Sequence, residues 1–210
     1  MNTVLEIEDL SFAYPGQPPL AAHWSARIEA GVTVLQGDTG GGKSTLLRVL
    51  AGELRGTGRL TLAGTPLDAA PDAYRRAVFW CDPNIERFQQ MAVRECTGAL
   101  RGGDAQFDEA LWQGLVEGFA LTPHLDKKMY MLSTGSRRKV YLAAALASNR
   151  ALTLLDEPTG ALDAASIRCL WRTLAELAKH APTRAIVIAS SERVEAVPCV
   201  ATITLPPRGG

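Results

Sequence analysis

The pattern of apolar and polar residues predicts strands at both ends of the chain and a helical segment between them. The N-terminal residues alternate as a half-buried strand does, and short apolar runs of strand length recur further on. From 84 to 131 a helical period dominates, with Phe107, Leu111, Leu115 and Phe119 near one face. Further strands are predicted at 23–28, 32–35, 59–62, 77–80, 152–155, 185–189 and 200–205, and helices at 43–50, 137–147 and 164–179.

The order of these elements indicates the fold class. Strands alternate with helices towards both ends, which is typical of an α/β core with a mostly parallel sheet. The chain has 210 residues, enough for one large domain and too few for two ordinary ones. We therefore expect a single domain over residues 1–210, with a helical subdomain over approximately residues 84–147.

Composition narrows the class of protein. Hydrophobic residues make up 47% and charged residues 21%, as in folded globular proteins. Basic and acidic residues both number 22, so we expect no nucleic-acid partner. No apolar run reaches the ~20 residues that span a bilayer, and no signal peptide is visible, so we expect a cytoplasmic location. The four cysteines are scattered, which favours reduced thiols over a zinc site.

A glycine-rich loop follows the third predicted strand. Residues 37–44 read GDTGGGKS and fit the GxxxxGK[ST] pattern, with a strand before it and a helix after it. Glycines let the backbone wrap a phosphate, Lys43 would reach the β- and γ-phosphates, Ser44 would bind Mg²⁺, and Thr45 would support the α-phosphate. The flanking elements disfavour the alternative of an unrelated glycine-rich turn. The expected nucleotide-binding residues here are Gly37, Asp38, Thr39, Gly40, Gly41, Gly42, Lys43, Ser44 and Thr45.

Two carboxylates end the apolar strand predicted at 152–155. Asp156 would hold Mg²⁺ through water, and Glu157 would polarise the water that attacks the phosphate. The competing interpretation is a solvated strand end. That is usual for one acid after a strand, but less so for the longer run DEPTGALD found here.

Several segments resemble the motifs of ABC ATPases. Residues 132–136 read LSTGS and resemble the LSGGQ signature of that family. Residues 156–159, DEPT, and 161–163, ALD, resemble its Walker B motif and D-loop. Tyr14 matches the aromatic A-loop residue that stacks on adenine, and residues 91–95 are similar to the segment after the Q-loop. The resemblance covers nearly the whole chain.

The resemblance implies an α/β P-loop NTPase with a RecA-like core, an antiparallel β subdomain and a helical signature subdomain. It implies ATP and Mg²⁺ as cofactors. Two such domains pack head to tail, so Ser133 and Gly135 of one chain would bind the nucleotide held by a second ABC ATPase chain, in a homodimer or a heterodimer. A separate transmembrane permease would be the other partner, holding the chain at the cytoplasmic face of the inner membrane.

Four positions depart from the family pattern. Cys81 stands where the Q-loop glutamine is expected, and Ser191 stands where the switch histidine is expected. Thr134 replaces a signature glycine, and Ser136 replaces the signature glutamine. A serine cannot carry positive charge as an imidazole does, so we expect slow ATP turnover. Alternatively, the family tolerates such changes at a site that a different partner chain completes.

The leading functional hypothesis is the ATP-hydrolysing subunit of an ABC transporter. The alternative is a soluble ABC ATPase with a non-membrane partner, for example in iron–sulfur assembly. The signature-like segment and the D-loop argue against an unrelated P-loop kinase or GTPase. The basic run 137–139 is expected to be a solvated face. Phe88 and Met91 are expected either in a docking groove for another protein or in the core.

Overall fold

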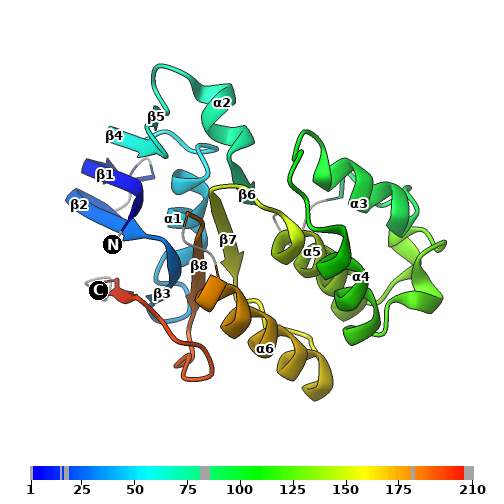
Figure 1. Ribbon diagram of the computed structural model, residues 1–210. Coiled ribbons are helices and arrows are strands. Elements are labelled where there is room, and N and C mark those ends of the chain that lie inside the picture. The colour runs from blue at the N-terminus through cyan, green and yellow to red at the C-terminus, as the bar shows by residue number, and fades with distance from the viewer. Residues whose placement is uncertain (1, 15, 17–18, 81–85, 181–182, 206–210) are drawn as a thin grey trace.

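The computed structural model describes residues 2–14, 16, 19–80, 86–180 and 183–205 (Figure 1). One sheet has the strand order β2-β1-β4-β5 and is antiparallel; the other has the order β6-β7-β8-β3-β9 and is parallel. The strands are β1 Thr3–Phe12, β2 Ala21–Glu29, β3 Gly31–Gln36, β4 Thr57–Leu62, β5 Thr65–Pro66, β6 Val78–Trp80, β7 Leu152–Asp156, β8 Ala185–Ser190 and β9 Ala201–Thr204. The helices are α1 Lys43–Leu50, α2 Pro71–Arg76, α3 Val93–Arg101, α4 Glu109–Gly118, α5 Thr134–Ala147 and α6 Ala164–His180, with short 3-10 turns at Thr122–His124 and Met129–Met131.

The parallel sheet brings the carboxyl ends of its central strands together. β8 is buried along its whole length and β3 along all but its last residue, as in strands covered on both faces. Gln36 at the end of β3 pairs with Ser190 of β8, and Asp156 at the end of β7 pairs with Ala189. The loops that follow these strands therefore meet at one edge of the sheet.

Helix α1 packs between the two sheets. Its Leu46 and Leu47 share a core with Leu154 and Val187 of the parallel sheet and with Ile7 of the antiparallel sheet. The opposite face of the parallel sheet belongs to a second core, which it shares with α5 and α6 (Figure 1). Because α1 is buried on both sides, the loop that precedes it is anchored to a rigid element.

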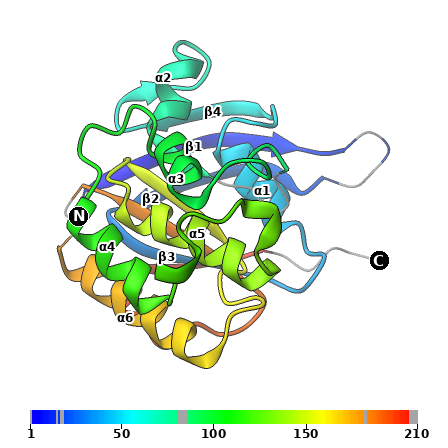
Figure 2. The ribbon, with the colours of Figure 1, turned by 90° about the vertical axis from the view of Figure 1, so that its right-hand side faces the viewer.

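Helices α3, α4 and α5 form a helical lobe beside the parallel sheet (Figure 2). Phe107, Leu115 and Phe119 are buried there, and the partly buried Leu111 packs against the same core, which confirms the predicted apolar face of this segment. Phe88 is only 3% exposed and lies in that core too. Of the two interpretations of Phe88, core packing is therefore the correct one.

Two short elements escaped the sequence analysis. Helix α2 begins with Pro71 at its first position, where the ring fits a helix start, and β5 contributes a two-residue strand to the antiparallel sheet. The Tyr74 side chain is fully buried, and its hydroxyl donates to the Leu50 carbonyl at 2.8 Å. This tertiary bond ties α2 to the end of α1 and stabilises a helix too short for a periodic pattern to reveal.

Candidate active site

The loop between β3 and α1 has a backbone that only glycine adopts without strain. Gly40 and Gly42 have φ angles of 77° and 94°, in the left-handed region. The Gly41 N–H donates to Asp38 O at 2.9 Å, and a Cβ on Gly41 would lie 2.9 Å from the same oxygen. The start of α1 carries no side-chain cap, so the positive end of its dipole faces the loop. This geometry suits an anion.

Lys43 is held across the loop by three acceptors. Its side chain is 5% exposed, and Nζ donates to Gly37 O at 2.8 Å and Asp38 O at 3.1 Å. Nζ also lies 3.2 Å from Oε1 of Glu157, the residue that follows β7. An ammonium has three protons, and these three acceptors match them in number.

Asp156 ends β7 as a partly buried carboxylate with an unpartnered oxygen. Burial raises its pKa, and a hydrogen bond from the Ser44 hydroxyl acts in the opposite direction. Among the described residues, Asp156 Oδ1 is buried and has no hydrogen-bond partner. A carboxylate oxygen beside a hydroxyl is the hard-oxygen pair that Mg²⁺ prefers. No group of three or more His, Cys, Asp or Glu residues that could hold a metal ion occurs in the described ranges.

Glu157 has a constrained backbone at the edge of the sheet. Its φ is 41°, which is uncommon for a residue other than glycine. The Glu157 N–H donates to Ala189 O at 2.9 Å, and Glu157 Oε1 accepts the Ser191 backbone N–H at 2.8 Å. The side chain is 38% exposed, so the carboxylate is held on one side and open to water on the other.

Lys43, Ser44 and Glu157 line one pocket of about 450 Å³, within the range of small-molecule sites. The Tyr14 hydroxyl lies 3.4 Å from Thr45 Oγ1, and the Tyr14 ring meets Phe12 edge-on at a centroid distance of 5.2 Å. The predicted adenine-stacking aromatic therefore borders the same pocket as the phosphate loop. The pocket is lined by Tyr14, Thr39, Gly40, Gly42, Lys43, Ser44, Thr45 and Glu157.

The signature residues lie at the start of α5 and do not line this pocket. Ser133 caps the helix, and its Oγ accepts the Ser136 N–H at 3.1 Å. Gly135 is packed so closely that a methyl group there would overlap the Ala161 carbonyl. Ser133 and Thr134 are exposed, so the start of α5 presents a surface rather than completing its own chain's pocket.

The departures from the family pattern have different structural settings. Cys81 lies outside the described residues. Ser191 follows β8, where its backbone N–H bonds to the Glu157 carboxylate. The sequence analysis was wrong about the basic run 137–139: the side chain of Lys139 is only 13% exposed, and Arg138 donates to the Glu157 carbonyl. Nothing in the local sequence pattern signals these contacts, because both partners come from the segment after β7.

A glycine-rich loop between a strand and a helix, with a lysine and an adjacent acidic strand end, defines a P-loop NTPase. The family model described as ABC transporter matches residues 23–160. The chain therefore belongs to the ABC transporter family, and it has the ATP-binding ATPase domain of that family.

Known proteins of this family resemble the chain over most of its length. It is 34% identical to the cytochrome c biogenesis ATP-binding export protein CcmA of Rhodospirillum rubrum, over 90% of this chain and 81% of that protein. It is 29% identical to the energy-coupling factor transporter ATP-binding protein EcfA2 of Methanospirillum hungatei, with 100% of this chain and 54% of that protein covered. Some relatives are much longer: the chain spans 9% of ATP-binding cassette sub-family A member 7 of Rattus norvegicus, at 31% identity over 92% of the chain.

A solved structure supports the same fold. An ABC transporter ATP-binding protein from Pyrococcus furiosus matches with a TM-score of 0.75 and 26% identity, over 96% of each chain. The P-loop NTPase fold, with a parallel sheet, an antiparallel sheet and a helical lobe, is therefore as predicted.

Proposed function

We propose that this chain is the ATP-binding and ATP-hydrolysing subunit of an ABC transporter and drives transport through ATP-dependent dimerisation. The observation that carries the proposal is the convergence of Lys43, Ser44 and Glu157 with Tyr14 on one pocket. Phosphates, a hydrolytic water and an adenine ring need these side-chain types. The relatives named above, an export protein and an energy-coupling factor component, support transport as the process served.

Within this pocket we assign roles from the chemistry of each residue. The phosphate loop from Gly37 to Ser44 binds the phosphates, with Thr45 on the α-phosphate side and Tyr14 against adenine. Ser44 and Asp156 fit Mg²⁺, because the unpartnered Asp156 oxygen needs a cation or a water molecule. When bound, Mg²⁺ neutralises charge on the phosphates.

Glu157 is the residue that would act on water. Its carboxylate is partly exposed at the pocket wall and is oriented by the Ser191 amide. It can accept a hydrogen bond from a water molecule and so orient it for attack on the γ-phosphate. For Lys43 to bind phosphate it must exchange the Glu157 carboxylate for a phosphate oxygen, which also frees Glu157 for water.

A second ABC ATPase chain completes the mechanism. The exposed start of α5, with Ser133 and Gly135, combines a helix N-terminus with small residues and lies outside its own pocket. We propose that it binds the γ-phosphate held by the second chain, whether identical or different. Because Cys81 and Ser191 replace side chains that the family uses at this site, we propose slow intrinsic turnover.

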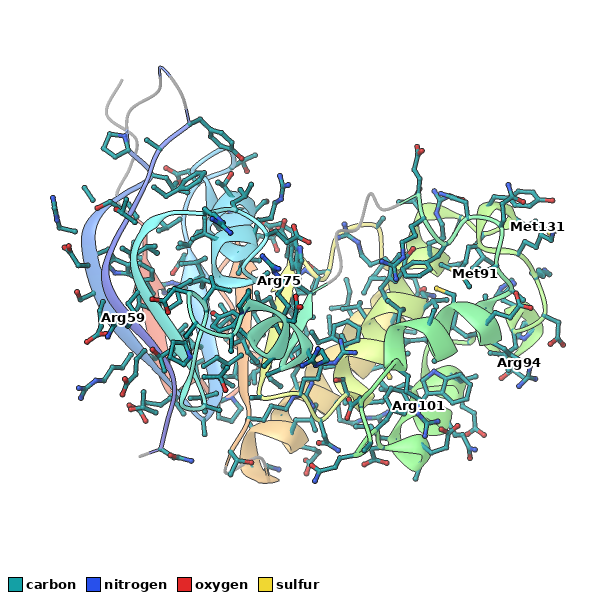
Figure 3. The ribbon with its side chains drawn as sticks, turned by 90° about the horizontal axis from the view of Figure 1, so that it is seen from above. Arg59, Arg75, Met91, Arg94, Arg101 and Met131 are labelled. Atoms are coloured by element: carbon teal, nitrogen blue, oxygen red, sulfur yellow. The ribbon has the colours of Figure 1, made fainter. Side chains whose placement is uncertain are left out.

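A separate permease is the proposed membrane partner, which would hold the chain peripherally at the cytoplasmic face. None of the described helices is long and apolar enough to cross a membrane. Tyr130 and Met131 are 53% and 59% exposed, and the backbone N–H of Tyr130 bonds to Gln89 O beside the partly buried Met91. Figure 3 shows Met91 and Met131 on the same side of the helical lobe. This apolar surface suits a cytoplasmic helix of a permease.

The decisive experiment is purification of the tagged chain from detergent-solubilised membranes, with mass spectrometry of the proteins that accompany it. We expect a stoichiometric multi-span membrane protein, lost when Tyr130 and Met131 are both changed to Ser. Matched exchanges at exposed sites on another face, Thr57→Ser and Arg59→Ser, should leave it bound. Recovery only with a soluble scaffold would reject the transporter proposal and favour a soluble ABC ATPase.

A further inference from the structure

Two side chains of the basic run at the start of α5 bond to the segment that follows β7. Arg138 Nη1 donates to the backbone carbonyl of Glu157 at 2.5 Å. Lys139 Nζ lies 2.5 Å from Asp163 Oδ2, and this hydrogen bond, with two more from Ser166, lowers the Asp163 pKa. Two consecutive residues of one helix thus hold both ends of the loop that carries the water-activating carboxylate.

Gly160 lies directly against the Arg138 guanidinium. Its φ lies outside the left-handed region, so the backbone does not require glycine there. A methyl group on Gly160, however, would overlap Nη1 of Arg138. The missing side chain makes room for the guanidinium at the place where it reaches the Glu157 carbonyl.

The Glu157 backbone needs such support. Its φ of 41° is unfavourable for a residue with a side chain and persists only where neighbouring groups hold it. The Glu157 N–H is held by Ala189 of β8, and its carbonyl accepts both the Gly160 N–H, at 3.0 Å within the same loop, and Arg138 of α5. Arg138 is thus the contact that ties this peptide to α5, and the backbone from which the Glu157 side chain extends is held on both sides.

Arg138 also faces the neighbouring carboxylate. It lines a cavity of about 40 Å³ together with Asp156 and Pro158. The guanidinium therefore lies beside both acidic residues and outside the lining of the open pocket.

We propose that Arg138 is a positioning residue. It extends from α5 and holds the strained Glu157 backbone, so the orientation of α5 determines the direction of the carboxylate that would activate water. Arg138 lies five positions after Ser133 on the same chain. A shift of α5 on contact with a second chain's nucleotide would therefore move Glu157 in its own site. The inference rests on the proposed role of Glu157.

The test is a cycle of variants in the full chain, with kcat and KM for ATP measured alongside urea unfolding. Arg138→Gln should lower kcat about 10-fold or more, because a small misplacement of a catalytic group is costly. It should leave KM within about twofold, because Arg138 lines no part of the nucleotide pocket. Arg138→Lys keeps a donor and should recover part of the loss. The exposed Arg172→Gln on α6 is the matched control and should keep the parental kcat.

The Gly160→Ala variant tests specifically the contact between Arg138 and the Glu157 carbonyl. Its methyl group should displace the Arg138 guanidinium and lower kcat in the parent chain, yet add less than about twofold in the Arg138→Gln background, because variants that break one contact are not additive. Equal losses in both backgrounds, or a kcat unaffected by Arg138→Gln, would overturn the inference. A kcat loss explained by unfolded protein in the urea data would overturn it too.

Glu157→Gln separates this inference from the function on which it rests. If that variant hydrolyses ATP normally, the role of Glu157 is wrong and the inference falls with it. If Glu157→Gln is inactive while Arg138→Gln is fully active, the proposed function stands and only the positioning role of Arg138 is wrong.

Discussion

Lys43 Nζ lies 3.2 Å from Glu157 Oε1, so the cation expected to bind phosphate is paired with the carboxylate expected to act on water. Lys43 has two further acceptors in its own loop, the carbonyls of Gly37 and Asp38. A nucleotide that binds through Lys43 must compete with Glu157 for one of its protons. In the proposed mechanism, phosphate binding by Lys43 and release of the Glu157 carboxylate are therefore linked steps.

Replacing Glu157 by Gln should tighten nucleotide binding while nearly abolishing hydrolysis. The amide competes more weakly for Lys43 and does not repel the γ-phosphate. The pair is partly exposed, with Glu157 38% accessible, and pairs of this kind contribute little. We expect the Kd for a non-hydrolysable ATP analogue to fall about 2- to 5-fold, measured by calorimetry.

The control for that measurement is Glu195→Gln, which removes a carboxylate that is 78% exposed and remote from the pocket lining. Its Kd should match that of the parent chain. An unchanged or weaker affinity in Glu157→Gln would show that the contact with Lys43 does not oppose nucleotide binding.

Asp156→Asn should stabilise the nucleotide-free chain at neutral pH. Burial raises the Asp156 pKa in the folded state, so the ionised carboxylate opposes folding. At pH values between the Asp156 pKa of the unfolded chain and that of the folded chain, the folded state binds more protons than the unfolded state. The free energy of unfolding therefore falls as pH rises. The penalty is complete above the folded pKa and absent below the ordinary Asp value of about 3.9.

The measurement is urea unfolding of both chains across this pH range. The variant should be the more stable one at pH 7, and its advantage should shrink as the pH falls towards the ordinary Asp value. Addition of Mg²⁺ and ATP should reverse the order at neutral pH, since the variant loses a metal ligand and with it the stabilisation by bound ligand. A variant less stable than the parent at pH 7 would refute the account.

The predictions from sequence succeeded where one local segment carries all the information. Helix α1 spans Lys43–Leu50 as predicted, because its limits follow from the glycines before Lys43 and the apolar period after it. The strand β7 ends at Asp156, with Glu157 directly after it, because the apolar run stops at Asp156. The prediction that Tyr14 lies beside the glycine-rich loop came from the resemblance to a family motif and not from the chemistry of tyrosine.

The contacts missed from sequence join segments far apart in the chain. Arg138 and Glu157 are 19 residues apart, and Arg184 and Ala145 are 39 residues apart. A charged residue is normally solvated, so the sequence predicts exposure both for Arg138 on α5 and for Arg184 before β8. Only the packing of α5 against β7 and β8 shows that these arginines bond to backbone carbonyls instead.

Arg184→Met should destabilise the fold. The Arg184 side chain is buried and donates to the carbonyls of Ala145 and Leu146 at the end of α5, and to Thr153 Oγ1 on β7. Burial lowers its pKa to about 10, so it remains charged at neutral pH. Leaving these acceptors without donors should cost roughly 2–4 kcal/mol of unfolding free energy. Urea unfolding with the exposed Arg172→Met as control measures the loss, and a loss no larger than that of the control would refute the bracing role.

Ser191→His should raise the rate of ATP hydrolysis. The Ser191 backbone N–H already orients the Glu157 carboxylate at 2.8 Å, and this bond survives the substitution because it involves only the main chain. An imidazole adds a group that can bridge to the γ-phosphate and carry positive charge, which serine cannot. We expect kcat to rise about 10-fold or more, in the range of gains from a well-placed acid–base group.

The matched control for this gain places the same imidazole nearby but outside the site. Arg193 has a side chain that is 82% exposed, and Arg193→His should leave kcat at the parental value. Steady-state phosphate release at saturating ATP compares the three chains. A Ser191→His rate equal to the parental rate would mean that the missing switch histidine does not limit turnover, and would favour a site completed by a different ABC ATPase chain.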